Sequence, residues 1–202
     1  MESFGTVWEK GSPAFWDSMW TSRSRHLTVQ AMLKSAQKAA RIIEVGCGHG
    51  HFLKELLRRG WKGTFHGFDF HAQGVATTRA LMAELNVEGS CTAGDVMDCD
   101  LPEADLGLLS AVIVHQHSWA PMVIQLLRSA PVVLMTVDYV VPGDHHKSVW
   151  MDAGHFDTWY SKVAMEKEAK ALGLALSWSA LEAPARRKAG VLVGVSRGRL
   201  LG

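Results

Sequence analysis

The sequence predicts an α/β fold: a doubly wound, mostly parallel seven-stranded sheet, preceded by a helical N-terminal extension and closed by a C-terminal β-hairpin. Three observations lead to this prediction. Short β-branched and apolar runs alternate with helical segments along most of the chain. The first of these runs ends in a glycine-rich turn that opens directly into a helix. The last two runs are joined by a charged loop, which is typical of a hairpin.

The composition is that of an ordinary globular protein. The chain has 202 residues, of which 48% are hydrophobic and 20% are charged, and single domains commonly contain ~100–200 residues. We therefore expect one domain over residues 1–202, with the helical extension over 1–40 and the α/β core over 41–202.

Two helices are predicted in the extension. Ser12 and Pro13 form a helix-start signal, because a hydroxyl can cap free N–H groups and proline is tolerated in a first turn. This helix continues to Trp20. A polar run over 21–24 separates it from a second helix over 26–40, which contains neither glycine nor proline.

The core elements follow from the apolar runs and from the glycines that end helices. The run over 131–137 is almost continuously apolar, as expected for a buried parallel strand. Strands are predicted over residues 42–45, 64–68, 90–93, 106–114, 131–137, 175–181 and 191–195. Helices are predicted over residues 51–59, 74–85, 122–128 and 157–172.

The turn after the first strand reads Glu-Val-Gly-Cys-Gly-His-Gly from Glu44 to Gly50. Glycine lacks a Cβ atom, so a ligand can approach the backbone N–H groups at the start of the following helix. The glycines have the spacing G-x-G-x-G, with an acid two residues before the first. Dinucleotide enzymes instead use G-x-G-x-x-G. The spacing therefore favours S-adenosylmethionine (SAM) over NAD.

Residues 42–50, Ile-Ile-Glu-Val-Gly-Cys-Gly-His-Gly, resemble motif I of class I, Rossmann-like SAM-dependent methyltransferases. The resemblance implies that SAM is the cofactor and that the chain is a methyltransferase. It also implies that Glu44 helps to fix the methionine ammonium, a role that suits a carboxylate facing a cation. The residues that it assigns to the methionine and ribose part of SAM are Gly46, Cys47 and Gly48, and Gly50 is a further predicted cofactor-binding residue.

Later strand ends match the same family in order. Asp69 resembles the acid that accepts both ribose hydroxyls, and Phe70 would cover one face of the adenine. Asp95 resembles the acid that receives the adenine amino group, with the Val96 N–H directed to the ring. Ser110 begins a segment similar to the fourth-strand motif beside the transferring methyl. Taken alone, an acid at a strand end is more often a helix cap, but the ordered combination favours the cofactor site.

Polar residues also gather after the fourth and fifth predicted strands, where open α/β sheets form their ligand crevice. They are His115, Gln116, His117, Asp138, Tyr139, His145 and His146. We predict His115 and His145 as catalytic, because a neutral imidazole takes a proton from an oxygen or nitrogen nucleophile near neutral pH. A metal site at His115 and His117, on one strand face, is an alternative that no further ligand spacing supports, and no metal is predicted. The third interpretation is hydrogen-bonding loop residues.

An aromatic segment before the core has two interpretations. Residues 15–20, Phe-Trp-Asp-Ser-Met-Trp, resemble a segment that precedes motif I in several methyltransferase branches and closes over SAM. Trp20 and Arg23 would then cap the cofactor or contact the acceptor. Aromatic residues at helical spacing also commonly pack into a core.

The predicted reaction is in-line displacement of the SAM methyl group by an oxygen, nitrogen or sulfur nucleophile of a small molecule. The net charge of +1 gives no reason to expect a polyanionic partner, so a nucleic acid is unsupported. The alternatives are a protein or RNA acceptor, a non-catalytic methyltransferase-like binding or scaffold protein, and a nicotinamide or flavin enzyme with a degenerate loop.

The chain has features of a cytoplasmic protein. Cys47, Cys91 and Cys99 show no C-x-x-C spacing and are expected to be reduced thiols. The N-terminal residues lack a secretion signal, and no apolar stretch approaches the ~20 residues that span a bilayer. No membrane partner is therefore expected. The sequence does not identify the acceptor or the oligomeric state.

Overall fold

A computed structural model describes residues 27–151, 155–179 and 191–198. The predicted first helix of the extension, with Trp20 and Arg23, lies outside these residues. The helices are α3 (Leu27–Ala36), α4 (His51–Arg58), α5 (Ala72–Glu84), α6 (Ala120–Leu126) and α7 (Lys162–Ala171), with 3-10 turns η1 (Val96–Asp98) and η2 (Ile113–His115). The strands are β1 (Arg41–Val45), β2 (Thr64–Asp69), β3 (Gly89–Ala93), β4 (Leu106–Leu109), β5 (Val132–Val137), β6 (Val140–Val141), β7 (Lys147–Met151), β8 (His155–Ser161), β9 (Leu174–Ser179) and β10 (Val191–Arg197).

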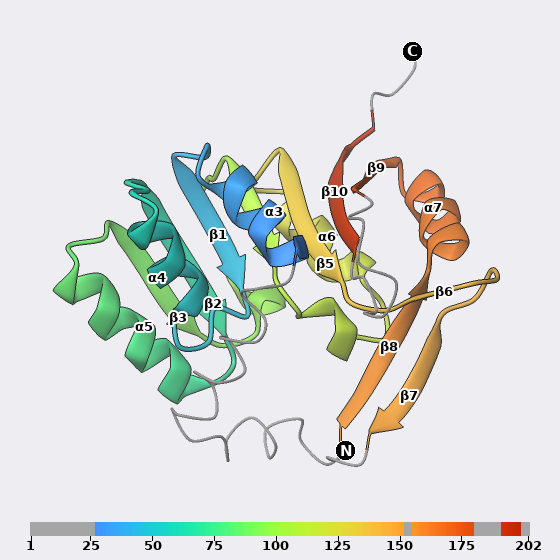
Figure 1. Cartoon of the computed structure of the whole chain (residues 1–202), viewed down its shortest axis with the longest axis horizontal. Coiled ribbons are helices and arrows are strands. Elements are labelled where there is room, and N and C mark those ends of the chain that lie inside the picture. The colour runs from blue at the N-terminus through green and yellow to red at the C-terminus, as the bar shows by residue number, and fades with distance from the viewer. Residues whose placement is uncertain (1–26, 152–154, 180–190, 199–202) are drawn as a thin grey trace.

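A seven-stranded sheet in the order β3-β2-β1-β4-β5-β10-β9 forms the centre of the fold (Figure 1). Strands β1 to β5 pair in parallel, and β10 pairs antiparallel with both β5 and β9. The predicted mostly parallel sheet and its C-terminal hairpin are confirmed. The strand order reverses between β1 and β4, which makes this pair the switch point of the sheet.

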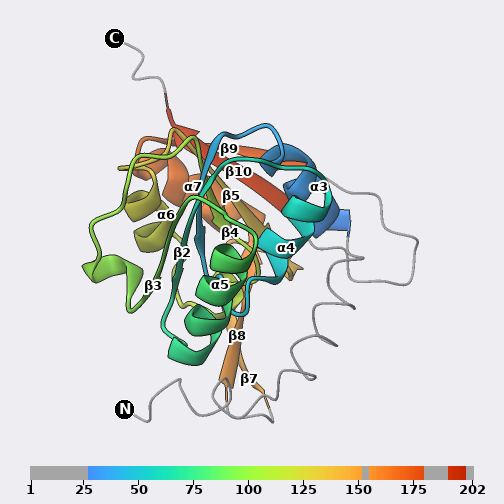
Figure 2. The same cartoon turned by 90° about the vertical axis from the view of Figure 1, so that its left-hand side faces the viewer.

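Helices cover both faces of the sheet. Figure 2 shows α3, α4 and α5 on one side, with α6 and α7 on the other. The side chains of β1 alternate between these layers: Ile42 packs with Leu33 of α3 and Phe52 of α4, whereas Ile43 packs with Val123 of α6 and Met165 of α7. All six side chains are fully buried, so the two apolar cores fix the position of the strand that carries the glycine loop.

The fourth strand is shorter than predicted. The expected strand over 106–114 ends at Leu109, and residues 113–115 form η2. The extended run stops because Ala111 takes a left-handed conformation with φ +59°, and its N–H donates to Thr136 Oγ1 at 2.8 Å. His115 and His117 therefore do not alternate along a strand, which removes the geometric basis for a shared metal. Within the described part of the chain, no group of three or more His, Cys, Asp and Glu side chains is arranged to hold a metal ion.

The helix predicted over 157–172 begins only at Lys162. The residues before it form β8, the central strand of a second sheet in the order β6-β8-β7, which the sequence analysis missed. Ser161 ends this strand and caps α7, because its Oγ accepts the Ala164 N–H at 3.2 Å. Figure 1 shows β7 and β8 extending past the carboxyl ends of the main strands.

None of the helices described in this structure is long and apolar enough to cross a membrane.

Candidate functional site

The glycine loop follows β1 at the switch point of the sheet. Gly46, Gly48 and Gly50 have φ angles of +76°, +48° and +74°. Residues with a Cβ atom rarely adopt this left-handed backbone conformation. Gly46 and Cys47 both donate their N–H groups to Phe68 O, at 2.7 and 3.2 Å. The loop is therefore held against the end of β2 by its own backbone.

The surroundings of two loop glycines differ. A Cβ atom on Gly46 would lie 2.4 Å from Val112 Cγ2, so the segment after β4 packs directly on the loop. At Gly48, apart from its chain neighbours, the single atom of the described residues within 4 Å of such a Cβ is Asp69 Oδ2, at 3.9 Å. Within the described part of the chain, the backbone at Gly48 therefore has open space beside it, where a ligand can approach.

Asp69 ends β2 and turns toward the glycine loop. Its Oδ2 accepts the Gly48 N–H at 2.8 Å, and its Oδ1 accepts the His71 N–H at 2.8 Å. Thr78 Oγ1 fixes the same loop from α5 by donating to Gly48 O at 2.7 Å. Because each carboxylate oxygen has two lone pairs, Asp69 keeps capacity to accept hydroxyl groups of a ligand.

Glu44 lies in β1, two residues before the loop, and is only 2% exposed. Its Oε2 has no hydrogen-bond partner among the described residues. Burial raises the pKa of Glu44 well above its usual range, and the negative charges of Cys91 and Asp69 act in the same direction. A buried carboxyl without a partner is costly, and a cationic ligand group would supply the missing partner. Glu44 and the open backbone at Gly48 therefore fit the methionine end of SAM.

The remaining residues predicted for the cofactor lie at successive strand ends. Phe70 is 59% exposed, and Ser110 is half-buried directly after β4. Val96 is buried at the start of η1, whereas Asp95 is exposed and its Oδ1 caps η1 by accepting the Met97 N–H at 2.9 Å. The helix-cap role weighed for this acid is therefore present in the structure. Cys47 contributes its backbone to the loop, because its side chain is buried against Cys91.

His115 lies beside the carboxylate of Asp157, a residue that the sequence did not point to. Its Nδ1 lies 3.3 Å from Asp157 Oδ1, and the two side chains are 18% and 9% exposed. His115 belongs to η2 and Asp157 to β8, which contact each other. Asp157 was not singled out because residues 157–161 were assigned to a helix, whose side chains would point in other directions.

The other histidines have different surroundings. His145, predicted as catalytic, has a side chain that is 89% exposed and lies 3.3 Å from Asp144 Oδ1. His146 is held between two elements: its Nδ1 accepts the Ser161 N–H at 3.0 Å, and its Nε2 lies 3.2 Å from Glu168. A donor at Nδ1 and an acceptor at Nε2 fix the tautomer of His146 with its proton on Nε2, so both ring nitrogens hold these elements together.

Two aromatic side chains hold the second sheet to the main one. Tyr160 is buried, and its hydroxyl lies 2.9 Å from Ile113 O and 2.8 Å from Gln116 O. Trp119 Nε1 donates to Glu168 Oε2 at 2.6 Å. These contacts fix η2 and the start of α6 relative to β8 and α7. They therefore set the separation of His115 and Asp157.

Further polar and aromatic groups lie on the second sheet. His117 Nδ1 is 3.4 Å from Ser148 Oγ of β7. The rings of Tyr139 and Trp159 are 5.5 Å apart, and Lys147 Nζ lies 5.6 Å from the centre of the Trp159 ring. The second sheet therefore presents mixed aromatic and polar groups beside the His115–Asp157 pair.

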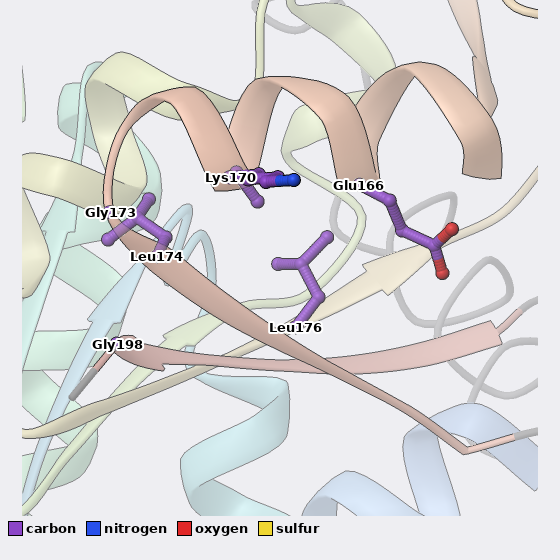
Figure 3. A pocket seen from close by; sticks show the side chains of 7 residues that line it. Glu166, Lys170, Gly173, Leu174, Leu176 and Gly198 are labelled. Carbon is purple, nitrogen blue, oxygen red and sulfur yellow. The ribbon is translucent and has the colours of Figure 1, made fainter. Parts of the chain in front are cut away.

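A separate hollow of about 300 Å³ lies between α7 and the C-terminal hairpin, beside the start of β9 and the end of β10 (Figure 3). Glu166 and Lys170 of α7 line it together with Leu174 and Leu176 of β9. Leu174 pairs with Arg197, next to the first residue of β5. The hollow therefore lies at the amino ends of the parallel strands, whereas the glycine loop lies at their carboxyl ends. It contains none of the residues predicted for cofactor binding or catalysis.

Comparison with known proteins agrees with this geometry. The family model described as "Methyltransferase domain" matches residues 42–136. No curated protein matches the sequence.

Similar solved structures include 1,6-didemethyltoxoflavin-N1-methyltransferase from Burkholderia thailandensis with bound 1,6-didemethyltoxoflavin and S-adenosylhomocysteine (13% identity, 96% of this chain and 85% of that chain, TM-score 0.73). A SAM-dependent methyltransferase from Clostridium acetobutylicum ATCC 824 is 9% identical over 92% of this chain and 98% of that chain, with a TM-score of 0.68. Magnesium protoporphyrin IX methyltransferase from Synechocystis PCC 6803 with bound SAM is 13% identical over 96% of this chain and 88% of that chain, with a TM-score of 0.64. At these identities the likeness shows the fold alone.

Proposed function

We propose that this chain, which belongs to the class I SAM-dependent methyltransferases, methylates an oxygen, nitrogen or sulfur nucleophile of a small molecule within one domain. The observation that supports this proposal most directly is the glycine loop, where the backbone of Gly48 contacts the Asp69 carboxylate at 2.8 Å and follows a buried Glu44 whose Oε2 has no partner among the described residues. The near-neutral net charge of +1 and two similar structures named for small-molecule acceptors support the acceptor class.

The proposed donor site uses the residues around the loop. Glu44 binds the methionine ammonium, and Asp69 accepts the ribose hydroxyls with its remaining lone pairs. The backbone of Gly48 lets the ligand approach closely, and Gly46, Cys47 and Gly50 complete the proposed loop site. The residues proposed for the adenine and for the region beside the methyl group are Phe70, Asp95, Val96 and Ser110. Bound SAM supplies a methyl group that is activated by the positive charge on its sulfur.

The proposed acceptor side contains the His115–Asp157 pair. His115 Nδ1 faces the Asp157 carboxylate at 3.3 Å, and a neutral imidazole oriented in this way can take a proton from an O–H or N–H acceptor. Asp157 also stabilises the imidazolium that forms. Alignment of the two reactants supplies most of the acceleration, since positioning alone can contribute about 7–11 kcal/mol. His145 is not given this role, because its side chain lies on the surface beside Asp144.

Calorimetric titration with SAM tests the donor site. Wild-type protein should bind SAM, and Asp69→Ala should weaken binding at least tenfold, since each lost charge-assisted hydrogen bond contributes about 1.5–3 kcal/mol. Asp98→Ala is the matched control, because Asp98 is an exposed acid in η1, and its affinity should stay within twofold. Unchanged affinity in Asp69→Ala would refute the ribose assignment.

Transfer of label from methyl-tritiated SAM into a cell extract tests the acceptor class. Label should enter the small-molecule fraction, and label confined to protein or RNA would establish the alternative acceptors. His115→Gln should reduce the transfer at least tenfold, in line with the 10²–10⁴-fold contribution typical of general bases, while the SAM affinity remains within twofold. A reduction in His145→Gln instead would move the role of base to His145.

A further inference from the structure

Two buried cysteines meet beneath the glycine loop. Cys47 lies within the loop and Cys91 lies in the middle of β3, and each is 4% exposed. Their Sγ atoms are 3.4 Å apart. The two thiols therefore contact each other across 44 residues of sequence, at the point where the loop rests on the sheet.

Gly67 of β2 makes this contact possible. It pairs with Cys91 in the parallel ladder, and a Cβ atom on Gly67 would lie 2.8 Å from Cys47 Sγ and 2.9 Å from Cys91 Sγ. The two sulfur atoms thus occupy the space that a side chain at this position would fill. The absence of that side chain lets the sulfur atoms approach one another.

The surroundings favour one thiolate in the pair. The hydrogen bond from Cys47 lowers the pKa of the Cys91 thiol, and the charge of Arg79 acts in the same direction. Arg79 is held nearby because its Nε donates to Cys91 O at 2.7 Å. The same pairing raises the pKa of Cys47. Because the thiolate is the nucleophile of cysteine chemistry, Cys91 is the sulfur that reacts first.

We propose that Cys47 and Cys91 form a redox modification site, in which hydrogen peroxide converts the two thiols into a disulfide that weakens SAM binding. The Cys91 thiolate attacks one peroxide oxygen, the O–O bond breaks, and the departing hydroxide takes up a proton to form water. Cys47 then attacks the sulfenic sulfur of Cys91, and the hydroxyl leaves with the Cys47 proton as a second water. Two thiols are oxidised and one peroxide is reduced.

The effect on SAM rests on the proposed function and follows from the position of Cys47. Closing the sulfur atoms from 3.4 Å to a disulfide length of about 2.05 Å draws Cys47 toward β3. Cys91 is fixed in the ladder with β2, so the loop makes the larger adjustment. The next residue, Gly48, donates to Asp69 at 2.8 Å, and displacing its N–H changes the site proposed for the ribose.

The experiment compares full-length protein kept reduced with the same protein treated with hydrogen peroxide. Peptide mapping by mass spectrometry should find Cys47 joined to Cys91, and SAM titration should show at least tenfold weaker binding that dithiothreitol restores. In Cys91→Ser, peroxide should produce no such link and should leave the affinity unchanged. Cys99→Ser is the matched control, because it removes the third cysteine and keeps the pair, and it should behave as the wild type.

Three outcomes would overturn the inference. Peroxide treatment that yields only singly oxidised cysteines, or a link to Cys99, contradicts the modification site. A Cys47–Cys91 link that leaves the affinity unchanged contradicts the effect on SAM. Absence of SAM binding in the reduced protein contradicts that effect together with the proposed function, whereas the mapped disulfide still reports on the cysteine pair. If Cys91→Ser lowers the melting temperature, Cys91→Ala provides the same readouts.

Discussion

Substituting Glu44 with glutamine separates the effect of the buried carboxyl on folding stability from its effect on SAM binding. Glu44 is 2% exposed, and its Oε2 lacks a hydrogen-bond partner among the residues described. Glutamine has nearly the same shape and never ionises. We therefore expect Glu44→Gln to stabilise the ligand-free protein at neutral and alkaline pH, and to weaken SAM binding because the ammonium loses its carboxylate.

The stability cost of the Glu44 carboxyl depends on pH, and it increases as the pH rises. Burial raises the pKa of Glu44 in the folded protein, so the folded state keeps this proton at pH values where the unfolded chain has lost it. Stability of the wild type therefore falls as pH rises through this interval. The interval begins near the ordinary glutamate pKa of about 4.3, and each pH unit within it costs about 1.4 kcal/mol.

Glutamine is also a buried polar group, so Glu44→Gln removes only the cost that comes from ionisation of the carboxyl. At about 1.4 kcal/mol for each unit by which burial raises the pKa of Glu44, the free energy of unfolding at pH 8 should rise by at least about 1.4 kcal/mol, an increase in melting temperature of at least about 3 °C. Near pH 4 the carboxyl is protonated in both states, and the variant and the wild type should unfold alike.

Thermal unfolding of both proteins between pH 4 and 9, with SAM titration at pH 7.5, measures these effects. Glu84→Gln is the matched control, because Glu84 is an exposed carboxylate at the end of α5, and it should not change the pH dependence. The reasoning fails if Glu44→Gln destabilises the protein at pH 8 or if the difference does not vary with pH. Retained SAM affinity would remove Glu44 from the ammonium site.

Gly67→Ala should destabilise the protein by about 1–3 kcal/mol in urea unfolding, because its Cβ atom would lie within 3.0 Å of both Cys47 and Cys91 sulfur atoms; an unchanged midpoint would contradict the close packing. Tyr160→Phe should cost about 1–3 kcal/mol, since it removes the donor that reaches Ile113 O and Gln116 O at 2.9 and 2.8 Å. Stability equal to that of the wild type would show that this hydroxyl does not fix η2. Gly46→Ala should abolish SAM binding in calorimetry, because φ is +76° and the added Cβ atom would lie 2.4 Å from Val112 Cγ2; affinity within threefold of the wild type would contradict this.

The main sheet and the glycine loop were predictable because their signals are local. An apolar run, a glycine turn and an amphipathic helix lie consecutively in the sequence, and a left-handed φ at Gly46 or Gly50 is what glycine permits. Asp69 is the last residue of its strand, β2. The structure places its carboxylate on the loop with a 2.8 Å hydrogen bond to Gly48.

The second sheet was missed because its stability comes from distant partners. β8 leads into α7 without glycine or proline at the boundary, so the helical pattern was extended back over it. Thr158, Trp159 and Tyr160 are residues favoured in strands, and Ser161 is a good N-cap. These two signals together would have revealed the strand, and with it the carboxylate of Asp157.

The end of β4 was missed for another reason. Ala111 takes a φ of +59°, which alanine rarely adopts, so its identity gives no signal of a turn. The hydroxyl that accepts its N–H belongs to Thr136, 25 residues away. Only the folded structure shows why the extended run stops there and why His115 lies in a turn.

The contact of Val112 with Gly46 connects the proposed SAM site to the proposed acceptor site. The turn that carries His115 starts immediately after Val112. A movement of the glycine loop when SAM binds should therefore also move the imidazole of His115. Occupancy of one side should then change affinity on the other, and by thermodynamic reciprocity the coupling acts equally in both directions. We expect acceptor molecules to bind more tightly to the SAM-loaded protein than to the empty one, which would favour an ordered sequence of arrival.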